Sequence, residues 1–517
     1  MIVGGGIAGL AAAFFLRDRG LAVTVLEGSP RLGGKLATSQ VAGIAVDEGA
    51  ESLLARRPEG TDLIQAVGLA DDLVLPGTTS AGIWTRGQLH PLPKRQFMGV
   101  PADLDELSRA GILSPEGTAR AWADLELPVT DRDGDVSVAS YVGARLGGEL
   151  VDRLVDPLLG GVYAGRSDEL SFEATLPALA RASGEHRSLS AAAAALLPPP
   201  GRPPGVPNSP GATSPADASS PPGGQSPAVP TQAPVFTTLS GGLGTLPPVL
   251  ATASGAIVRT GAMVRGLARV PGGWRLTVGS AHAPELLEAD AVILALPARP
   301  AGRLLAAVPA AAVAASGLGE IAYASMAIVT LAYPAAAFPS LPGGSGYLVP
   351  AVDGHPVKAV TFSTIKWPHL LNETRPAGDI HLVRCSVGRL GEEAVLQRAD
   401  GELAALAAAD LAAATGVRGA PVDVRVTRWG GGLPQYTVGH LDRVRRIRAS
   451  VAAQPGLAVC GAAFDGIGIP ACIASARLAA DQVLSHLESA AVNLAAVRPA
   501  AVKPAAGNPA AGKGVGQ

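Results

Sequence analysis

A glycine-rich turn at the start of the chain constrains the fold more than any other feature. A short apolar strand runs into the pattern G-x-G-x-x-G, and the apolar run that follows, 10–19, predicts a helix. A second apolar strand, 22–26, ends on Glu27, about 20 residues beyond the glycines. Strand, glycines, helix, strand and acid agree in order and spacing, and together they predict a βαβ unit that binds a dinucleotide.

Each part of this unit has a physical task. Gly4 permits a tight turn, Gly6 has no side chain that would block a pyrophosphate, and Gly9 lets helix and strand pack closely. The helix start offers free N–H groups and a partial positive charge to the phosphates. Glu27 can accept hydrogen bonds from a ribose 2′-OH, and its charge would repel a 2′-phosphate. A glycine-rich turn alone is a weak signal, but the agreement of all parts favours a dinucleotide site.

The segment after the second strand narrows the choice of dinucleotide. Residues 27–35 read E-x3-R-x-G-G-K. This run resembles the motif that follows the second strand in flavoprotein amine oxidases, whose dinucleotide is FAD. The amides of Gly33 and Gly34 and the cations of Arg31 and Lys35 would lie near a diphosphate. Taken alone, the two cations would be an ordinary basic loop; beside the first motif, they favour FAD.

Composition and charge argue against several other classes of protein. The chain has 517 residues, enough for two or three domains, and its net charge of −2 gives no basic footprint for nucleic acid. The three cysteines show neither metal-binding nor disulfide spacing, so we expect no metal site and a reducing compartment. The mean hydropathy of +0.29 owes much to alanine, and the longest apolar stretches, such as 304–318, are too short for a transmembrane helix. With a strand at residue 1, we expect no signal peptide and a cytoplasmic protein.

The order of predicted strands indicates interleaved domains. Strands are predicted at the start, middle and end of the chain, at 22–26, 257–261, 274–278, 291–297 and 457–461, and the last two are expected to be buried. An FAD-binding domain is therefore built from three parts: 1–84, 235–300 and 451–489. A substrate or helical part, 85–197, and a substrate-binding domain, 301–450, lie between them. The predicted class is α/β (α+β overall): a Rossmann-like FAD-binding domain interleaved with a substrate-binding domain and a mainly helical subdomain, of amine-oxidase type.

Two further segments are predicted to be disordered. Proline, serine, glycine and alanine dominate 198–234 and, similarly, 490–517. Such segments bury too little apolar surface to offset the entropy of ordering. We expect neither segment to carry chemistry.

Beyond the first motifs, several segments resemble one family closely. They are 47–57, 89–94, 98–101, 156–165, 346–349, 366–369, 384–388, 428–429, 433–440 and 461–473. In this order they resemble the protoporphyrinogen/coproporphyrinogen oxidases of haem biosynthesis. The resemblance runs from residue 1 to about 487, apart from the proline-rich insertion. Any one segment could be a packing element, but the ordered set identifies the chain as a member of this family.

The resemblance implies a reaction and a cofactor site. A porphyrinogen would be oxidised to a porphyrin, with six electrons passing to oxygen in three two-electron steps and hydrogen peroxide released. The flavin performs the hydride chemistry, so no side chain is assigned as catalytic. The implied partners are the porphyrinogen, oxygen and, in transient contact, downstream enzymes of haem synthesis. The implied FAD contacts are Gly4, Gly5, Gly6, Ile7, Ala8, Gly9, Glu27, Lys35, Gly49, Ala50, Glu51, Ser52, Val264, Trp429, Ile467, Gly468 and Ile469.

A porphyrinogen also sets requirements for its own site. It is a flat apolar ring with several carboxylates, so it needs cations at the rim and apolar walls. Arg57 is the first candidate for a propionate partner, because a guanidinium pairs with a carboxylate through two hydrogen bonds; Arg56 and Lys94 are further candidates. The resemblance implies three wall residues: Gly161, Val162 and Tyr347. Each of these residues could instead be an ordinary surface cation or a packing residue.

The sequence leaves alternatives open. Coproporphyrinogen III has two more carboxylates than protoporphyrinogen IX; the Arg56–Arg57 pair and an actinobacterium-like composition favour the former, and the latter is the alternative. An amine oxidase or carotenoid desaturase shares the FAD fold, and a flavin-binding interaction protein without turnover is a third reading. The first strand is also shorter than the usual five to six residues. We therefore expect the true start upstream of Met1, which the intact mass of the native protein would test.

Overall fold

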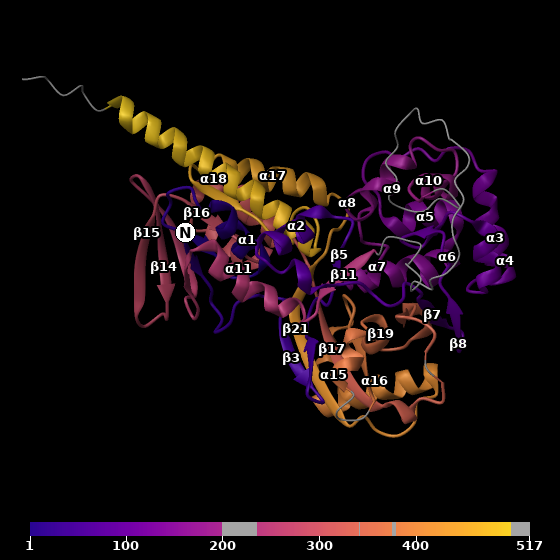
Figure 1. The fold of residues 1–517 in the computed structure, drawn as a ribbon. Helices are drawn as coiled ribbons and strands as arrows, with labels where there is room; N and C mark the ends of the chain where they lie inside the picture. The colour runs from indigo at the N-terminus through magenta and orange to yellow at the C-terminus, as the bar shows by residue number, and fades with distance from the viewer. Residues whose placement is uncertain (199–234, 341, 375–378, 498–517) are drawn as a thin grey trace, which may run out of the picture.

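The computed structural model describes residues 1–198, 235–340, 342–374 and 379–497 (Figure 1). The insertion predicted at 198–234 lies outside them except for its first residue. Of the predicted tail, 498–517 also lie outside, whereas 490–497 continue the last helix, α18 (Ile469–Val497). Residues 490–497 are therefore helical and not disordered as predicted, because their alanine-rich sequence is strongly helix-forming.

The first sheet joins strands from the start, middle and end of the chain. It is parallel, with the strand order β12 (Ile257–Arg259), β2 (Thr24–Leu26), β1 (Ile2–Val3), β16 (Val292–Leu294) and β22 (Leu457–Val459). Successive residues of a strand face opposite sides of a sheet, and here Ile2 packs into one core and Val3 into another. A sheet buried on both faces needs a covering layer on each.

Helices form one of these covering layers, and a mixed layer forms the other. On the first side lie α1 (Ile7–Leu16), α2 (Pro58–Ala66), α11 (Leu246–Ser254) and α18. On the second side lie the antiparallel strands β13 (Val264–Val270), β14 (Gly273–Gly279) and β15 (Pro284–Ala289) and the helices α12 (Ala298–Leu305), α13 (Ala312–Gly319) and α17 (His440–Ala452).

Two predicted boundaries in this domain need correction. The helix predicted at 10–19 spans Ile7–Leu16, because Gly6 is its N-cap and Asp18 takes a left-handed conformation with φ 60°. The predicted boundary of the substrate domain, 301–450, encloses most of α12, α13 and α17, yet their apolar faces pack in the core beneath β16 and β22. Tertiary packing, which the local pattern does not report, places them in the nucleotide domain.

A second, seven-stranded sheet forms the other large layer (Figure 1). Its strand order is β21 (Asp423–Pro434), β17 (Tyr323–Pro334), β20 (Ile380–Val387), β19 (Val357–Phe362), β18 (Gly346–Leu348), β7 (Gly82–Thr85) and β8 (Gln88–Pro91). All neighbours are antiparallel except β18 and β7. Because β7 belongs to this sheet, the boundary predicted after residue 84 cuts through a strand.

Register assigns residues to the two faces of the second sheet. One face packs against α16 (Asp400–Thr415) and carries Tyr347 and Cys385. On β20 the next residue back, Arg384, therefore lies on the opposite face. Leu348 shares that opposite face, because its partner Ala359 is two positions from Thr361, which pairs with Arg384.

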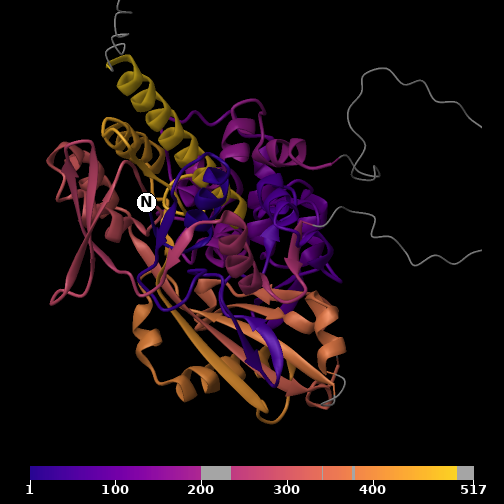
Figure 2. The same cartoon turned by 60° about the vertical axis from the view of Figure 1, so that its left-hand side comes forward.

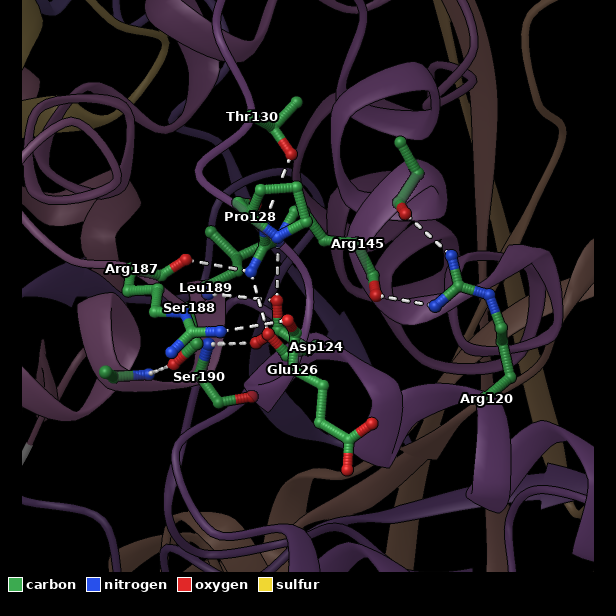
Figure 3. A network of polar contacts seen from close by, with 12 residues as sticks. Arg120, Asp124, Glu126, Pro128, Thr130, Arg145, Arg187, Ser188, Leu189 and Ser190 are labelled. Carbon is green, nitrogen blue, oxygen red and sulfur yellow. Dashed lines mark hydrogen bonds and ion pairs between the residues drawn. The ribbon is translucent and has the colours of Figure 1, made fainter.

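A helical subdomain packs against the face of the second sheet that lies opposite α16. Its main helices are α3 (Leu104–Ala110), α4 (Pro115–Trp122), α5 (Val138–Leu146), α7 (Asp156–Tyr163), α9 (Pro177–Ala182) and α10 (Leu189–Ala195). Inside it, Nε of the buried Arg145 donates to Oδ1 of Asp124 at 2.6 Å (Figure 3). In two views the β13–β14–β15 sheet lies at one end of the molecule and this subdomain at the other (Figure 1, Figure 2).

Short strands connect these three layers. They are the hairpin β3 (Thr38–Val41) and β4 (Ile44–Asp47) and the set β5 (Leu53–Leu54), β11 (Phe236–Leu239) and β6 (Leu73–Val74). The turns α14 (Ser363–Lys366) and α15 (His369–Thr374) lie beside β20. These pieces bring the loop 48–52 close to the second sheet.

Candidate active site

The N-terminal glycine turn has the geometry of a phosphate cradle. Gly4 has φ 111°, and a Cβ there would lie 2.3 Å from the carbonyl oxygen of Ala295. A Cβ on Gly9 would lie 1.9 Å from the oxygen of Gly4, so helix and strand touch. At Gly6, by contrast, the nearest atom to a Cβ is the Cα of Gly34, at 4.0 Å. A Cβ at Gly6 would therefore only touch Gly34 and would not clash with it, and no side chain caps the first N–H groups of α1, which include those of Ile7 and Ala8.

Glu27 is anchored at the carboxyl end of β2. Its Oε2 accepts from the amide of Gly5 and its Oε1 from that of Ser29, both at 2.7 Å. A Cβ on the next residue, Gly28, would meet the side chain of Met263, which directly precedes Val264. Two predicted contacts for the adenosine half of FAD, Glu27 and Val264, thus lie next to each other.

A third part of the site brings together residues nearly 400 positions apart. A Cβ on Gly49 would lie 2.1 Å from the oxygen of Lys35 and 3.1 Å from Cζ2 of Trp429. The indole Nε1 of Trp429 donates to the carbonyl of Glu48 at 2.9 Å, and the amide of Ala50 donates to the oxygen of Lys35. Burial lowers the pKa of the Lys35 ammonium below its usual value, because the charged form loses its hydration.

The C-terminal glycine turn lies beside the first one. A Cβ on Gly461 would be 3.9 Å from the Cβ of Ala8, so the turn before α18 meets the start of α1. At Gly468 a Cβ would meet nothing nearer than Pro470, at 3.8 Å, and α18 begins at the next residue, Ile469. The amide of Gly466, just before Ile467, donates to the hydroxyl of Tyr436 at 2.8 Å. The backbone at 467–469 is therefore both fixed and open on one side.

Glu51, a predicted cofactor contact, uses its carboxylate within the protein. Lys366 Nζ lies 2.6 Å from Oε1, and Arg384 Nη1 binds Oε2. Arg384 Nη2 also donates to the carbonyl of Gly49 at 2.7 Å. Burial alone would raise the pKa of Glu51, but the charges of Lys366 and Arg384 outweigh it and lower the pKa to about 2. Glu51, the residue before Ser52, thus anchors its loop through ion pairs to Lys366 and Arg384.

Sequence reasoning did not assign Lys366 or Arg384 to the site. Both belong to segments that carried the family resemblance, 366–369 and 384–388, and that was the only signal for them. Their partner, Glu51, lies more than 300 positions away. No local spacing reports such a pairing.

The structure brings together only some of the predicted substrate residues. Gly161 faces Leu348, because a Cβ on this glycine would lie 3.4 Å from Cδ2 of the leucine, and Val162 beside it is exposed. Tyr347, however, is only 3% exposed and packs toward α16. The side chain next to Gly161 is therefore Leu348, because neighbouring strand residues face opposite sides.

The predicted rim cations lie at the surface. Arg57 is 45% exposed and holds Glu59 through two hydrogen bonds, of 3.1 and 2.7 Å. Arg56 and Lys94 are also exposed. The amide of Arg57 donates to the carbonyl of Leu54, whose side chain is exposed together with that of its register partner, Phe236.

Comparison with known proteins identifies the family of this chain. The flavin-containing amine oxidoreductase family matches residues 7–484. The chain belongs to that family. Flavin-containing amine oxidoreductases bind FAD, so the predicted family, fold class and cofactor are confirmed. Three features of the site fit that cofactor: the glycine turn before α1, the hydrogen-bonded carboxylate of Glu27 and the glycine turn before α18.

Relatives within the family are similar from end to end. The coproporphyrinogen III oxidase of Mycobacterium tuberculosis (strain H37Rv) is 36% identical over 494 residues, 94% of this chain and 98% of the relative. That of Bacillus subtilis is 32% identical over 505 residues, 95% and 98%. A solved structure from Exiguobacterium sp., provisionally named a protoporphyrinogen oxidase, has a TM-score of 0.78, 32% identity and coverage of 94% and 98%.

Two observations complete the description of the site. Among the described helices, none combines the length and apolar character needed to cross a bilayer. Across the same parts of the chain, His, Cys, Asp and Glu side chains form no group that could hold a metal ion.

Proposed function

We propose that this flavoprotein oxidises coproporphyrinogen III to coproporphyrin III in haem biosynthesis. Three two-electron steps remove six electrons and six protons, and three molecules of oxygen become three of hydrogen peroxide. The observation that carries the proposal is end-to-end similarity to coproporphyrinogen III oxidases, at 36% and 32% identity over 98% of their length. A bovine protoporphyrinogen oxidase is 30% identical, which keeps protoporphyrinogen IX as the second candidate.

We assign the FAD contacts from the glycine turns outward. The first turn and Lys35 would bind the diphosphate, Glu27 and Val264 the adenosine half, and 49–52 with Trp429 and 467–469 the flavin. When bound, the flavin accepts the hydride equivalents from the substrate. Backbone groups of the glycine turns would hold both halves of the cofactor, because side chains at these positions would fill the space that the cofactor needs.

The surface beside this site suits an apolar ring with carboxylates. Leu54 and Phe236 are each 40% exposed, and Lys366 Nζ lies 5.5 Å from the centre of the Phe236 ring. Arg57 follows three residues after Leu54. An apolar surface edged by the exposed Arg57 matches a porphyrinogen with propionate groups, and Gly161 with Leu348 would form another wall.

We also place the reaction in the cytoplasm. The three cysteines, all within the described residues, are buried and free rather than paired. Free thiols suit a reducing compartment.

A direct assay tests the proposed reaction. Purified FAD-loaded protein is supplied with each porphyrinogen in air, and porphyrin fluorescence and peroxide are followed together. We expect three peroxides per porphyrin and a higher kcat/KM for coproporphyrinogen III. A higher kcat/KM for protoporphyrinogen IX would select the second candidate, and no turnover of either would leave a flavin-binding protein without this activity.

Arg57→Ala should weaken binding of the tetracarboxylate substrate. Losing one charge-assisted pair at a half-exposed position should raise KM about fivefold to tenfold, with kcat nearly unchanged. The control is Arg275→Ala, which removes an equally exposed arginine that pairs with Glu288 on the distant β14–β15 hairpin. Equal KM values for wild type and Arg57→Ala would remove Arg57 from the site.

A further inference from the structure

Three segments that carry no common sequence motif converge on one buried cluster. Arg384 comes from β20, Lys366 from the end of α14, and Glu51 from the loop after β4. Their side chains are 8%, 15% and 14% exposed. The cluster therefore ties the loop 48–52 of the nucleotide domain to the second sheet.

Arg384 fixes this loop through its backbone as well as through Glu51. Nη2 of Arg384 donates to the oxygen of Gly49 at 2.7 Å, while the amide of Ala50, in the same peptide unit, donates to the oxygen of Lys35. One peptide is thus held from both sides. Its orientation decides which backbone groups the loop presents to the flavin.

A small cavity lies beside the guanidinium. It measures about 30 Å³ and is lined by Arg384, Glu51, Asp47, Ser363, Trp367 and eight further residues. Arg384 Nε, Trp367 Nε1 and Ser363 Oγ are buried, and none of the three has a hydrogen-bond partner among the described residues. Buried donors without partners are costly, so a partner in this cavity is expected.

The chemistry of the lining identifies that partner. The guanidinium of Arg384 and the indole N–H of Trp367 would repel a cation, and the carboxylates of Asp47 and Glu51 would repel an anion. A water molecule accepts from both N–H groups and can donate to Ser363 or Asp47. The cavity is large enough for one, and buried waters typically make about three such bonds.

We propose that Arg384 is a positioning residue for the loop 48–52 and that an ordered water in this cavity completes its hydrogen bonds. The guanidinium then donates hydrogen bonds from Nη1 to Glu51, from Nη2 to the oxygen of Gly49 and from Nε to the water. This inference goes beyond the proposed reaction, because it rests on the flavin site and not on the identity of the porphyrinogen.

Flavin properties measured without substrate test the positioning role. Arg384→Gln in the full-length protein should raise the Kd for FAD at least about tenfold and shift the flavin visible spectrum and midpoint potential. Arg384→Lys, which keeps the charge but cannot bind Gly49 and the water together, should lie between wild type and Arg384→Gln. Should Arg384→Gln fail to fold, Arg384→Lys alone decides.

Arg389→Lys is the matched control. Arg389 is as buried as Arg384, lies two residues beyond β20 and binds the backbone oxygens of Val349 and His355 rather than the loop. It should change stability without changing the flavin spectrum or potential. Equal flavin properties for Arg384→Lys and Arg389→Lys would overturn the positioning role.

A high-resolution crystal structure of the FAD-loaded protein tests the water. We expect density within hydrogen-bond distance of Arg384 Nε and Trp367 Nε1, and weaker density in Trp367→Phe, which keeps an aromatic ring but loses the donor. A dry cavity in the wild-type protein would overturn this part of the inference. Because none of these measurements uses a porphyrinogen, failure of the inference is distinct from failure of the proposed function.

Discussion

Two buried arginines show what such a residue does inside one folding unit and between two. Arg145 bonds only within the helical subdomain, where its guanidinium binds the carboxylate and carbonyl of Asp124 and the carbonyl of Arg187 (Figure 3). Arg384 instead joins the second sheet to a loop of the nucleotide domain. The first network should govern stability, and the second should govern how two units face each other across the proposed cofactor site.

The partners of Asp124 extend the first network to a helix start. Its oxygens also accept from the amides of Leu189 and Ser190, the first residues of α10. Every carboxylate bond therefore lies within residues 124–190. Within the described parts of the chain, no hydrogen bond of this network reaches the segments proposed to contact the flavin.

Asp124→Ala should have the largest effect on stability. It leaves Arg145 buried without its carboxylate, so the free energy of unfolding should fall by about 3–5 kcal/mol. Urea unfolding followed by circular dichroism measures this. Glu126→Ala, which removes an exposed carboxylate two residues away, should change stability by less than about 0.5 kcal/mol. A shifted flavin spectrum in folded Asp124→Ala would break the contrast between the two networks.

Glu51→Gln should change the acid dependence of stability. Burial works against ionisation of Glu51, but Lys366 and Arg384 lower its pKa from 4.5 to about 2. The folded-state pKa is below the unfolded one, so the contribution is complete above pH 4.5 and is lost as the pH falls toward 2. Between these limits the wild type should lose about 2–3 kcal/mol more than Glu51→Gln.

Urea unfolding at pH 6 and pH 3 measures this difference. Glu59→Gln, which removes an exposed partner of Arg57, is the control and should differ from wild type by less than about 1 kcal/mol at both pH values. Parallel behaviour of wild type and Glu51→Gln would mean that the interdomain ion pairs contribute nothing.

Lys358→Met should have the smallest effect, and it should be stabilising. Lys358 is buried, and its Nζ donates to the carbonyl of Gly160 at 3.3 Å. Burial, helped by the nearby charge of Arg389, lowers its pKa from 10.5 to about 7. The unfolded chain binds more protons between these values, so wild-type stability rises with pH across this window.

The methionine variant removes that dependence. It should be about 1 kcal/mol more stable than wild type at pH 7, and its stability should not rise from pH 7 to 9 on this account. Urea unfolding at both pH values is the measurement, with the exposed Lys94→Met as control. If Lys358→Met were instead less stable than wild type, the buried ammonium of Lys358 would contribute to stability, as Arg145 and Arg384 are expected to do.

The sequence predicted the features that depend on local spacing. The first strand, the glycines, the helix and Glu27 lie within about 30 residues, so their pattern carries the fold class and the cofactor. Tyr347 shows the limit, because the register of β18 decides which of two neighbouring residues faces Gly161. The pairing of Glu51 with Arg384 depends on packing between two domains. Helices α12, α13 and α17 were misplaced for the same reason, since their apolar faces do not say which sheet they cover.

The strand order of the first sheet also has a consequence for protein synthesis. β1 pairs with β16, where Ile2 lies opposite Ile293, and β16 pairs with β22, where Val292 lies opposite Leu457. Strand partners so distant along the chain make folding slow. The helices of the helical subdomain, in contrast, come from one continuous stretch, 104–195, and can begin to form while the ribosome is still translating the C-terminal half of the chain. The nucleotide sheet is completed only after residue 459 has left the ribosome, so the cofactor site is among the last parts of the protein to form.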